Sequence, residues 1–347
     1  MLAAVYHDMA DLRVEELPRP TVGDDEALLR VRAASICGTD LRIYSSGHFK
    51  IPSGTSRILG HEFAGEVVEV GSLVESLTPG MRIAIAPNMG CGVCQQCIQG
   101  RSHLCPAYDA FGITIDGAFS EYMLIPREAI QQGNIVALPD WVSFEEAALN
   151  EPFSCCYNGS RACRIEPGDS VLIVGAGPIG IMHLFLASLS GASRIVISET
   201  IEERLSQALE FGADLVINPK KENLVAAIKE VTDGRGVDVI IVAAPSPAAQ
   251  EQALDLAAPQ GRVNFFGGLT QGSEFIKFNS NRVHYKQLVV TGTTGSNNYQ
   301  YRKSMEIVAS GRVDLSSLIS ARFPLTEVPE AFSLAASKKA MKVLIVP

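Results

Sequence analysis

Short runs in which hydrophobic and polar residues alternate dominate the first part of the chain. Such alternation indicates β-strands with one buried face. Turns containing glycine and proline, such as Pro79-Gly80, separate the runs, and regular helical spacing is scarce. Strands are expected at residues 27–34, 66–70, 82–86 and 118–125. The pattern predicts a small β-barrel-like domain over residues 1–151.

The pattern changes at about residue 152. Residues 171–174 form an uninterrupted aliphatic run, as in a strand covered on both faces, and a glycine-rich turn and an apolar helix at 181–189 follow. Strands and helices then alternate, with strands expected at 194–198, 215–217, 237–242, 262–266 and 288–291, and helices at 202–211, 224–231 and 248–257. Residues 152–291 are therefore predicted to form a doubly wound α/β domain.

The last segment, residues 292–347, contains a turn, a predicted helix at 299–310 and a predicted strand at 342–346. We expect this segment to return to the first domain, which would then be discontinuous and comprise 1–151 and 292–347. A length of 347 residues also exceeds what one compact core usually spans, so two domains are expected.

Composition and charge exclude several classes of protein. A formal net charge of -9 without a basic stripe argues against a nucleic-acid partner. No apolar run is long enough to span a membrane. The N-terminus lacks the basic start and apolar core of a signal peptide, so a cytoplasmic location is predicted. In that reducing compartment the 8 cysteines should be metal ligands, catalytic groups or buried thiols.

The strongest motif is a set of closely spaced cysteines. Its members are Cys91, Cys94, Cys97 and Cys105. This spacing predicts a Cys₄ tetrahedron around a structural zinc ion, and the alternative of four unrelated thiols is much less common. Because sulfur fills all four positions, this zinc should hold a loop together and take no part in catalysis.

A second set of ligand types comes from two separate segments. Cys37 precedes Gly38-Thr39-Asp40, and His61 and Glu62 follow Gly60. A thiolate, an imidazole and a carboxylate can supply three of the four ligands of a zinc ion, and three protein ligands with one open position are typical of a catalytic site. Read alone, a His-Glu pair is more often structural.

The glycine-rich turn after the first strand of the α/β domain predicts a dinucleotide site. Gly175 allows the tight turn, Gly177 the approach of a pyrophosphate, and Gly180 the close packing of helix on strand. The second strand ends at Glu199, where an acid can bind both ribose hydroxyls and repel a 2′-phosphate, which favours NAD. The alternative is an ordinary acid at a helix N-terminus.

Together these motifs resemble the zinc-dependent medium-chain dehydrogenase/reductase family along the whole chain. The resemblance implies a GroES-like β-barrel catalytic domain and a Rossmann cofactor domain. Residues 150–154, Asn-Glu-Pro-Phe-Ser, are similar to the sorbitol (polyol) dehydrogenase branch. This implies a catalytic zinc held by Cys37, His61 and Glu62, with Glu151 as a fourth ligand or as the holder of a zinc-bound water.

The resemblance also assigns roles to neighbouring residues. Asp40 would orient the zinc-bound His61, and Thr39 would pass the substrate proton onward, although Arg42 stands where relatives end that relay with a histidine. The residues expected at the cofactor, besides the three glycines, are Pro178, Ile179, Glu199, Arg204 and Lys342. Lys342 is expected to pair with the pyrophosphate, with a solvated lysine as the alternative.

These features predict an enzyme that uses zinc and NAD to oxidise a polyol, with or without a phosphate group, to a ketose, as a homodimer or homotetramer. Gly295-Ser296 replaces the Arg-Tyr substrate pair of polyol dehydrogenases, which weakens the case for sorbitol itself. A simple secondary-alcohol dehydrogenase and a threonine 3-dehydrogenase are alternatives, and Asn88 in place of a histidine counts against the latter. A non-enzymatic NAD-binding protein is the alternative from another class.

Overall fold

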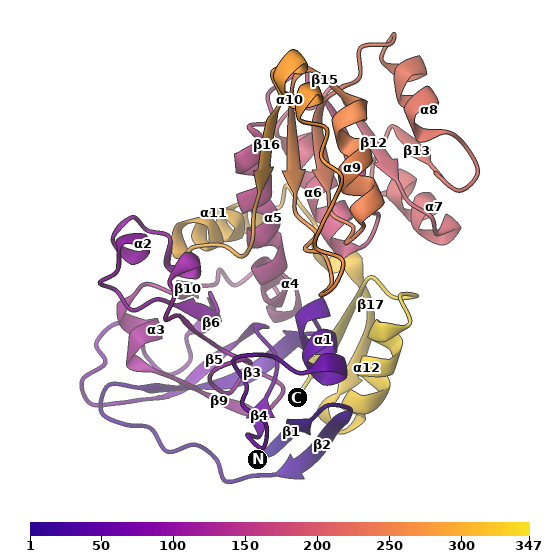
Figure 1. The fold of residues 1–347 in the computed structure, drawn as a ribbon. Helices are drawn as coiled ribbons and strands as arrows, with labels where there is room; N and C mark the ends of the chain where they lie inside the picture. Colours follow the sequence, from indigo (N-terminus) through magenta and orange to yellow (C-terminus); the bar gives the residue numbers. More distant parts are fainter. The chain divides into compact units, whose positions relative to one another are not determined.

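The computed structural model describes residues 1–347, which form two compact units (Figure 1). Unit 1 comprises Met1–Ser154 and Ser296–Pro347, and unit 2 comprises Cys155–Gly295. The predicted boundaries, after residues 151 and 291, lie within a few residues of these. The C-terminal segment belongs to unit 1. No helix is both long and apolar enough to cross a membrane.

Unit 1 is built mainly from antiparallel strands. Its 7-stranded sheet has the order β10-β6-β5-β3-β18-β17 with β9 also paired to β3, next to a 3-stranded sheet β2-β1-β4 and the pair β7-β8. The strands are β1 (Leu2–Asp8), β2 (Asp11–Glu16), β3 (Ala27–Ser35), β4 (Arg57–Ile58), β5 (Glu62–Val70), β6 (Arg82–Ile85), β7 (Asn88–Met89), β8 (Asp109–Ala110), β9 (Tyr122–Ile125), β10 (Ile135–Ala137), β17 (Ile319–Pro324) and β18 (Lys342–Val346).

The alternating pattern of the sequence explains the core of unit 1. Along β3, Val31 is buried while its neighbours Arg30 and Arg32 point to solvent. The buried side chains join one hydrophobic cluster that includes Phe63 and Phe119. Predicted strands 27–34, 66–70 and 82–86 are confirmed, whereas β9 is shorter than predicted.

Several helices complete unit 1, and most of them lack a clear sequence signal. They are α1 (Gly38–Ser46), α2 (Gln95–Ile98), α3 (Arg127–Gln131), α4 (Phe144–Ala148), α5 (Asn150–Cys163, continuing into unit 2), α11 (Asn298–Ala309) and α12 (Val328–Ala336). Of these, the sequence pattern predicts only the helix at 299–310, which is confirmed as α11. The shorter helices have few apolar residues, and α1 buries only Asp40 and Ile43. In contrast, α12 buries Val328, Ala331 and Phe332 at helical spacing, a signal that the sequence analysis overlooks.

Unit 2 has a 6-stranded parallel sheet in the order β13-β12-β11-β14-β15-β16, which confirms the predicted doubly wound α/β architecture. Its strands are β11 (Ser170–Val174), β12 (Arg194–Ser198), β13 (Leu215–Ile217), β14 (Val237–Val242), β15 (Ala257–Phe265) and β16 (Val289–Gly292), and its helices are α6 (Pro178–Leu189), α7 (Glu202–Glu210), α8 (Leu224–Val231), α9 (Pro247–Leu256) and α10 (Ser280–Lys286). β16 is an edge strand with Val289 exposed; the expected oligomer stays a prediction.

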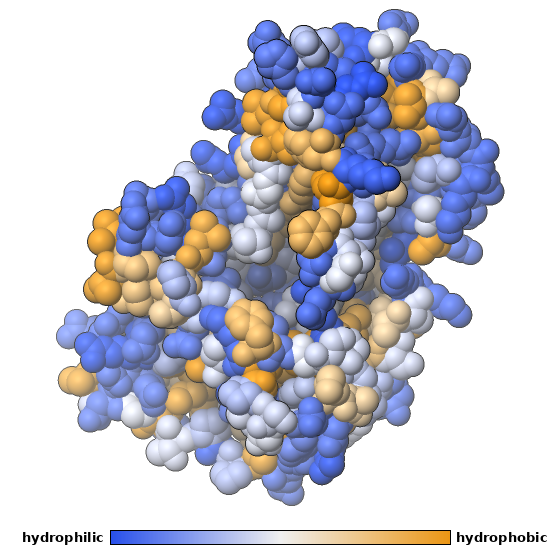
Figure 2. Space-filling model, viewed as in Figure 1, coloured by the Kyte–Doolittle hydropathy of each residue, from blue (hydrophilic) through white to orange (hydrophobic).

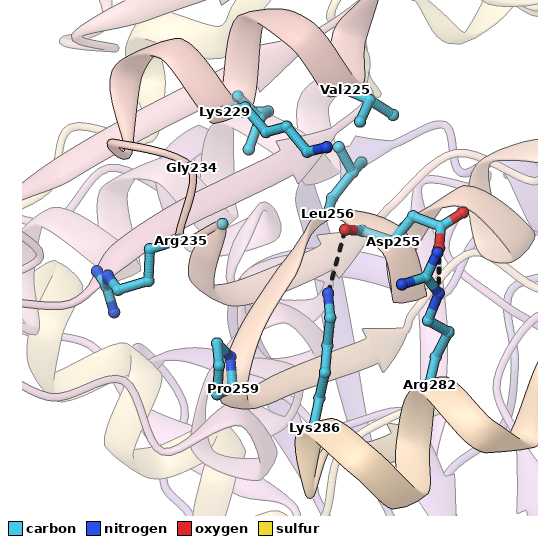
Figure 3. Close-up of a pocket in the computed structure, with 11 residues that line it drawn as sticks. Val225, Lys229, Gly234, Arg235, Asp255, Leu256, Pro259, Arg282 and Lys286 are labelled. Carbon is cyan, nitrogen blue, oxygen red and sulfur yellow. Dashed lines mark hydrogen bonds and ion pairs between the residues drawn. The ribbon is translucent and has the colours of Figure 1, made fainter.

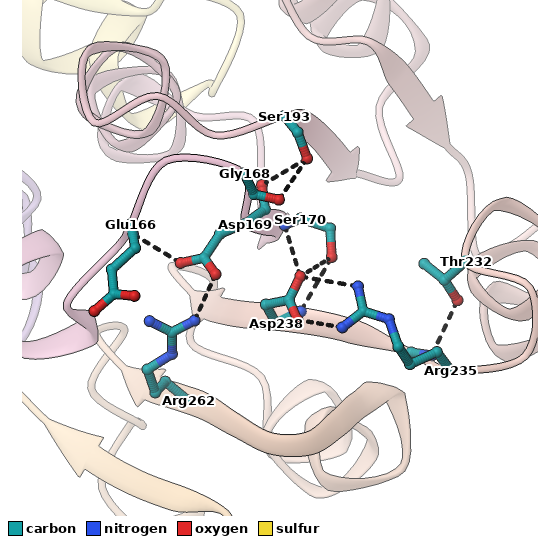
Figure 4. A network of polar contacts seen from close by, with 10 residues as sticks. Glu166, Gly168, Asp169, Ser170, Ser193, Thr232, Arg235, Asp238 and Arg262 are labelled. Atoms are coloured by element: carbon teal, nitrogen blue, oxygen red, sulfur yellow. Dashed lines mark hydrogen bonds and ion pairs between the residues drawn. The ribbon is translucent and has the colours of Figure 1, made fainter.

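A network of polar contacts links residues of β11, β14 and β15 and the turn before β11 (Figure 4). Asp238 accepts hydrogen bonds from the backbone N–H of Ser170 at 2.9 Å and from its hydroxyl at 2.7 Å, and it pairs with Arg235. Burial raises the pKa of Asp238, but Arg235 and Ser170 outweigh it and lower the pKa to about 2. Arg262 pairs with Asp169 at 2.8 Å. These ion pairs and hydrogen bonds stabilise the fold of unit 2.

A recess of about 500 Å³ lies among α8, α9 and α10 (Figure 3). Lys286 donates to the carbonyl of Ala257 at 2.6 Å and also approaches the last carbonyls of α9. Arg282 pairs with Asp255 at 2.8 Å. Cations are favourable at the carbonyl end of a helix because the dipole is negative there. The charged side chains Lys286, Arg282 and Asp255 therefore already have partners within unit 2.

The cysteine lobe projects from unit 1 and has little core of its own. All four ligand sulfurs lie within 4.8 Å of one another, and the four cysteines are free thiols in the structure, as a Cys₄ zinc site requires. Hydrogen bonds from the backbone N–H groups of Val93 and Cys94 lower the pKa of Cys91 to about 6. A Cβ on Gly90 would lie 2.5 Å from the sulfur of Cys97, so only glycine fits there.

Neither α2 nor the short turn Ser102–Leu104 buries any residue, while Val93 and Ile98 are more than 70% exposed. Figure 2 shows apolar side chains gathered on the surface of this lobe. Without a hydrophobic core, a lobe of this size would gain its stability from a metal ion held by the four cysteines.

The buried His183 of α6 is an exception to the rule that buried polar groups are paired. Neither ring nitrogen has a hydrogen-bond partner, and the ring packs edge-on against Phe266 with the centroids 4.7 Å apart. A Cβ on Gly159 would lie 2.9 Å from both rings, so the packing is tight. Burial lowers the pKa of His183 to about 3. The residue is therefore neutral in the folded protein.

Replacing His183 with leucine should make the protein less sensitive to acid. Between pH 6.5 and about 3 the unfolded chain binds a proton at this residue that the folded chain does not, so stability falls as the pH is lowered. At pH 5 this costs about 2 kcal/mol. Urea-unfolding midpoints at pH 7.5 and pH 5 should converge in His183→Leu but not in the exposed control His284→Leu. An equal acid sensitivity of both variants would contradict this account.

Replacing Cys97 with serine should remove one of two bound zinc ions per chain, because the structure contains two clusters of metal-ligand type. The lobe should then unfold locally, since zinc binding supplies the folding energy of such lobes. Metal analysis and limited proteolysis within residues 90–105 measure both effects. The half-buried Cys155 lies outside both clusters, and Cys155→Ser should keep both ions. Full zinc content in Cys97→Ser would show that the cysteines do not share an ion.

Candidate metal centre and cofactor loop

The catalytic ligands predicted from two distant segments meet in unit 1. The ligand atoms of Cys37, His61 and Glu62 all lie within 4.8 Å of one another. β3 explains this meeting, because its last residue, Ser35, pairs with Glu62 on β5 and with Leu344 on β18. Cys37 follows directly after the end of β3. The end of β3 thus lies beside the starts of β5 and β18.

Local backbone geometry fixes the ligand positions. Gly60 has φ +94°, and a Cβ there would lie 2.8 Å from the ring of Phe119, so the turn before His61 requires glycine. Cys37 is the N-cap of α1, and its backbone N–H donates to Oδ2 of Asp40 at 2.8 Å. This capping box holds the cysteine at the start of the helix.

Asp40 also faces His61. Its Oδ1 lies 3.3 Å from Nδ1 of the imidazole, and both residues are buried. Burial lowers the pKa of His61, but the charge of Asp40 and the neighbouring Cys37 outweigh it and raise the pKa well above the usual value. A carboxylate behind a ligating histidine orients the ring and makes it a stronger donor. The position of Asp40 therefore suits the role predicted for it.

Glu62 is paired with a residue from the other end of the chain. Its Oε2 lies 2.5 Å from Nζ of Lys342, which also donates to the carbonyl of Ile36 at 3.2 Å. Glu62 is fully buried and Lys342 is 5% exposed. Burial lowers the pKa of Lys342, but Glu62, Cys37 and Glu151 outweigh it and raise the pKa. The ammonium group is engaged inside unit 1, which does not favour the predicted contact with a cofactor pyrophosphate.

The remaining predicted residues of this site lie close by. Glu151 is buried in the first turn of α5 and acts electrostatically on Lys342, but it is not one of the three residues whose ligand atoms cluster. Whether Glu151 binds the metal directly stays a prediction. Thr39 is half-buried in the first turn of α1, and Arg42 is exposed on the same helix. The proton-relay role of Thr39 is likewise untested.

The donor groups fit a metal ion. Nδ1 of His61 and Oδ1 of Asp40 face each other at 3.3 Å, whereas buried Oε1 of Glu62 has no hydrogen-bond partner. Buried polar atoms are normally satisfied, and an ion beside such atoms accounts for orphans of this kind. Sulfur, nitrogen and oxygen donors together suit zinc, although a carboxylate-containing set also admits other divalent ions.

The surroundings of Ser296 have no signal in the local sequence. Its hydroxyl lies 2.6 Å from that of Ser154, which also donates to the carbonyl of Glu151 at 2.6 Å. Both serines are buried. Gly295-Ser296 stands where polyol dehydrogenases carry an Arg-Tyr pair, and the Ser296 hydroxyl is engaged by Ser154 inside unit 1.

The glycine-rich turn of unit 2 has the geometry of a dinucleotide-binding loop. Gly175, with φ +107°, follows β11, and a Cβ on Gly180 would lie 1.9 Å from the carbonyl oxygen of Gly175. A Cβ on Gly177 would meet only the guanidinium of Arg204, at 3.4 Å, so its backbone is accessible. Pro178 and Ile179 begin α6, whose N-terminus offers free N–H groups to a phosphate. The residues therefore fit a dinucleotide.

Glu199 stands at the end of β12, beside this turn. Its Oε2 accepts a hydrogen bond from the N–H of Ala176 at 3.0 Å, and its Oε1 accepts from the N–H groups of Thr200 and Ile201. Burial raises the pKa of Glu199, but these backbone donors outweigh it and lower the pKa. The group is therefore a carboxylate at neutral pH. A carboxylate still has lone pairs for ribose hydroxyls.

Comparisons with known proteins match both the unit with the candidate metal centre and the unit with the glycine-rich turn. The family model "Alcohol dehydrogenase GroES-like domain" matches residues 23–140, and "Zinc-binding dehydrogenase" matches residues 178–310. The chain is 34% identical over 351 residues to the sorbitol dehydrogenase of Bacillus subtilis (strain 168), covering 100% of this chain and 97% of that protein. It is 36% identical over 342 residues to the L-threonine 3-dehydrogenase of Pyrococcus horikoshii, covering 96% and 94%.

Solved structures share the fold. A protein of Sinorhizobium meliloti 1021, solved with NADP bound, matches with a TM-score of 0.92 at 34% identity, covering 100% of this chain and 99% of that one. With both family models and full-length relatives in agreement, the chain belongs to the zinc-dependent medium-chain dehydrogenase family.

Proposed function

We propose that this protein oxidises a secondary hydroxyl group of a sugar alcohol, with or without a phosphate group, to a ketone with NAD as the hydride acceptor. The observation that carries this proposal is the Cys37, His61 and Glu62 cluster with a further buried carboxylate, Glu151, nearby. Carboxylates beside the reaction site can accept hydrogen bonds from neighbouring hydroxyls of the substrate. A substrate with several hydroxyls uses such acceptors better than one with a single hydroxyl.

Different residues have different roles in the proposed reaction. When bound, the metal lowers the pKa of the substrate hydroxyl and the nicotinamide accepts the hydride. Asp40 orients His61, and the half-buried Thr39 accepts the hydroxyl proton on its way to solvent. In unit 2, the turn at Gly177 and the N-terminus of α6 bind the pyrophosphate.

The comparisons do not separate polyol from amino-alcohol oxidation, since the identities to the two relatives are 34% and 36%. Within this chain, Asn88 favours a polyol. The resemblance places a histidine at this position in threonine 3-dehydrogenases. The alternatives of a simple secondary alcohol and of a non-enzymatic NAD-binding protein predict different results in the following test.

With NAD, the purified protein should oxidise members of a panel of five- and six-carbon polyols and their phosphates faster than L-threonine or 2-propanol. Complete removal of the metal by a chelator should abolish NADH formation, and zinc should restore it. His61→Ala should lower kcat/KM about 100-fold or more, because a metal ion supplies several kcal/mol of transition-state stabilisation. The exposed control His284→Ala should retain activity.

Three outcomes would overturn parts of this proposal. Turnover that survives complete metal loss excludes the metal-dependent reaction. A clear preference for L-threonine or 2-propanol replaces the substrate class. Binding of NAD without turnover of any alcohol supports the non-enzymatic alternative.

Glu199 should make NAD the preferred cofactor, whereas Arg204 beside Gly177 is a group that can attract a 2′-phosphate. Glu199→Gln keeps a side-chain oxygen for the N–H of Ala176 and removes the charge that repels the phosphate. The ratio of kcat/KM for NAD to that for NADP should therefore fall about tenfold or more. The exposed control Glu203→Gln should leave the ratio unchanged. A wild-type preference for NADP would contradict the role given to Glu199.

A further inference from the structure

Lys342 is a buried cation at the metal centre for which the proposed reaction has no role. It is the first residue of β18, where pairing of Leu344 with Ser35 fixes the strand beside β3. A buried ammonium group is costly unless it is paired and hydrogen-bonded. Its partners are Oε2 of Glu62 at 2.5 Å and the carbonyl of Ile36 at 3.2 Å.

The two carboxylate oxygens of Glu62 have different surroundings. Oε2 is bound by Lys342, whereas Oε1 is buried and has no hydrogen-bond partner. One oxygen is therefore committed to the protein, and the other remains for an ion shared with Cys37 and His61. This division limits the number of oxygens that Glu62 can give to the ion.

A carboxylate can bind a metal ion through one oxygen or through both. Three protein ligands and one open position are the arrangement that lets a catalytic zinc take a substrate. If Glu62 gave both oxygens, the second would compete for that open position. The hydrogen bond from Lys342 opposes this, because a two-oxygen mode would break a buried, charge-assisted contact.

We propose that Lys342 is a positioning residue that holds Oε2 of Glu62 and so restricts this glutamate to one metal-ligand oxygen, Oε1, which keeps the fourth position free for the substrate hydroxyl. This inference rests on the metal-dependent reaction proposed above. It gives the C-terminal strand a direct part in the metal centre. It also explains why a lysine begins a strand whose next three residues are buried and apolar.

The charge balance of the cluster supports this assignment. Asp40 and Glu62 are fully buried, Glu151 is 8% exposed, and Cys37 adds a thiolate when a metal is bound. Lys342 is the cation that contacts this group, and the acidic members act on it in the order Glu62, Cys37 and Glu151. An ammonium group among these anions prevents a strong excess of negative charge around the ion.

Cobalt(II) provides a test because its visible d–d bands are intense in four-coordinate sites and weaken when a fifth ligand binds. The cobalt-loaded wild type should show intense bands. Lys342→Met should lose band intensity, since Oε2 is then free to bind, and Lys342→Arg should retain it because a guanidinium can still donate to Oε2. The exposed control Lys339→Met should match the wild type. Cobalt in the cysteine lobe adds the same background to every sample.

Kinetics provide a second readout. When a competing oxygen occupies the open position, Lys342→Met should have a raised KM for the substrate, with the KM for NAD nearly unchanged. An unchanged cobalt spectrum in a folded Lys342→Met would overturn the inference and leave Lys342 as a structural ion pair. If this variant does not fold, a structure of the metal-loaded wild type decides: Glu62 must ligate through Oε1 alone while Lys342 holds Oε2.

The spectrum needs no substrate, so it separates the two proposals. Loss of intensity in Lys342→Met without any polyol turnover would support the role of Lys342 and reject the proposed substrate. Polyol turnover with an unchanged spectrum would do the reverse.

Discussion

The candidate metal centre depends on pairing of the charged side chains that are buried in the core of unit 1, because this pairing offsets their desolvation cost. Asp40 and Glu62 have no exposed surface, and Lys342 has 5%. An unpaired charge in such surroundings costs several kcal/mol, so each must have a partner in a fixed position. Asp40 is held by the N–H of Cys37 and lies beside His61, and Glu62 is held by Lys342. The pairing that makes burial tolerable also orients the ligands.

The sheet of unit 1 determines where these charges meet. Ser35, the last residue of β3, has Glu62 of β5 on one side and Leu344 of β18 on the other. A one-residue slip of either pairing would turn Glu62 or Lys342 to the opposite face of the sheet. The hydrophobic cluster that includes Phe63 and Phe119 opposes such a slip, because it requires the present register. Packing energy thus secures the geometry of a polar site.

Features formed by residues close together in the sequence could be predicted from it, whereas contacts between distant residues could not. The cysteine lobe and the loop at Gly175 are local patterns, and their spacing alone indicates their chemistry. The contact of Lys342 with Glu62 spans 280 residues and has no local signal apart from a lysine at the start of an apolar strand. Helix α1 was missed because its first residues resemble a metal-binding turn and only Asp40 and Ile43 are buried. Strand β9 begins late because Ser120 bridges to Ala3 and Glu121 bonds to Leu2.

The hydroxyl pair of Ser154 and Ser296 limits which groups of the protein can bind the proposed polyol substrate. Both side chains are buried, and their donors are used on each other and on the carbonyl of Glu151. They have little capacity left for a substrate, and neither supplies the positive charge that an arginine would bring at that position. Hydrogen bonds to several hydroxyls of the proposed substrate would then fall to acceptors, and Glu151 is a buried carboxylate close enough to Lys342 to act on it electrostatically. In the proposed function, hydrogen bonds from the substrate's hydroxyls to anionic groups near the metal would therefore set the selectivity for polyols, with or without a phosphate group.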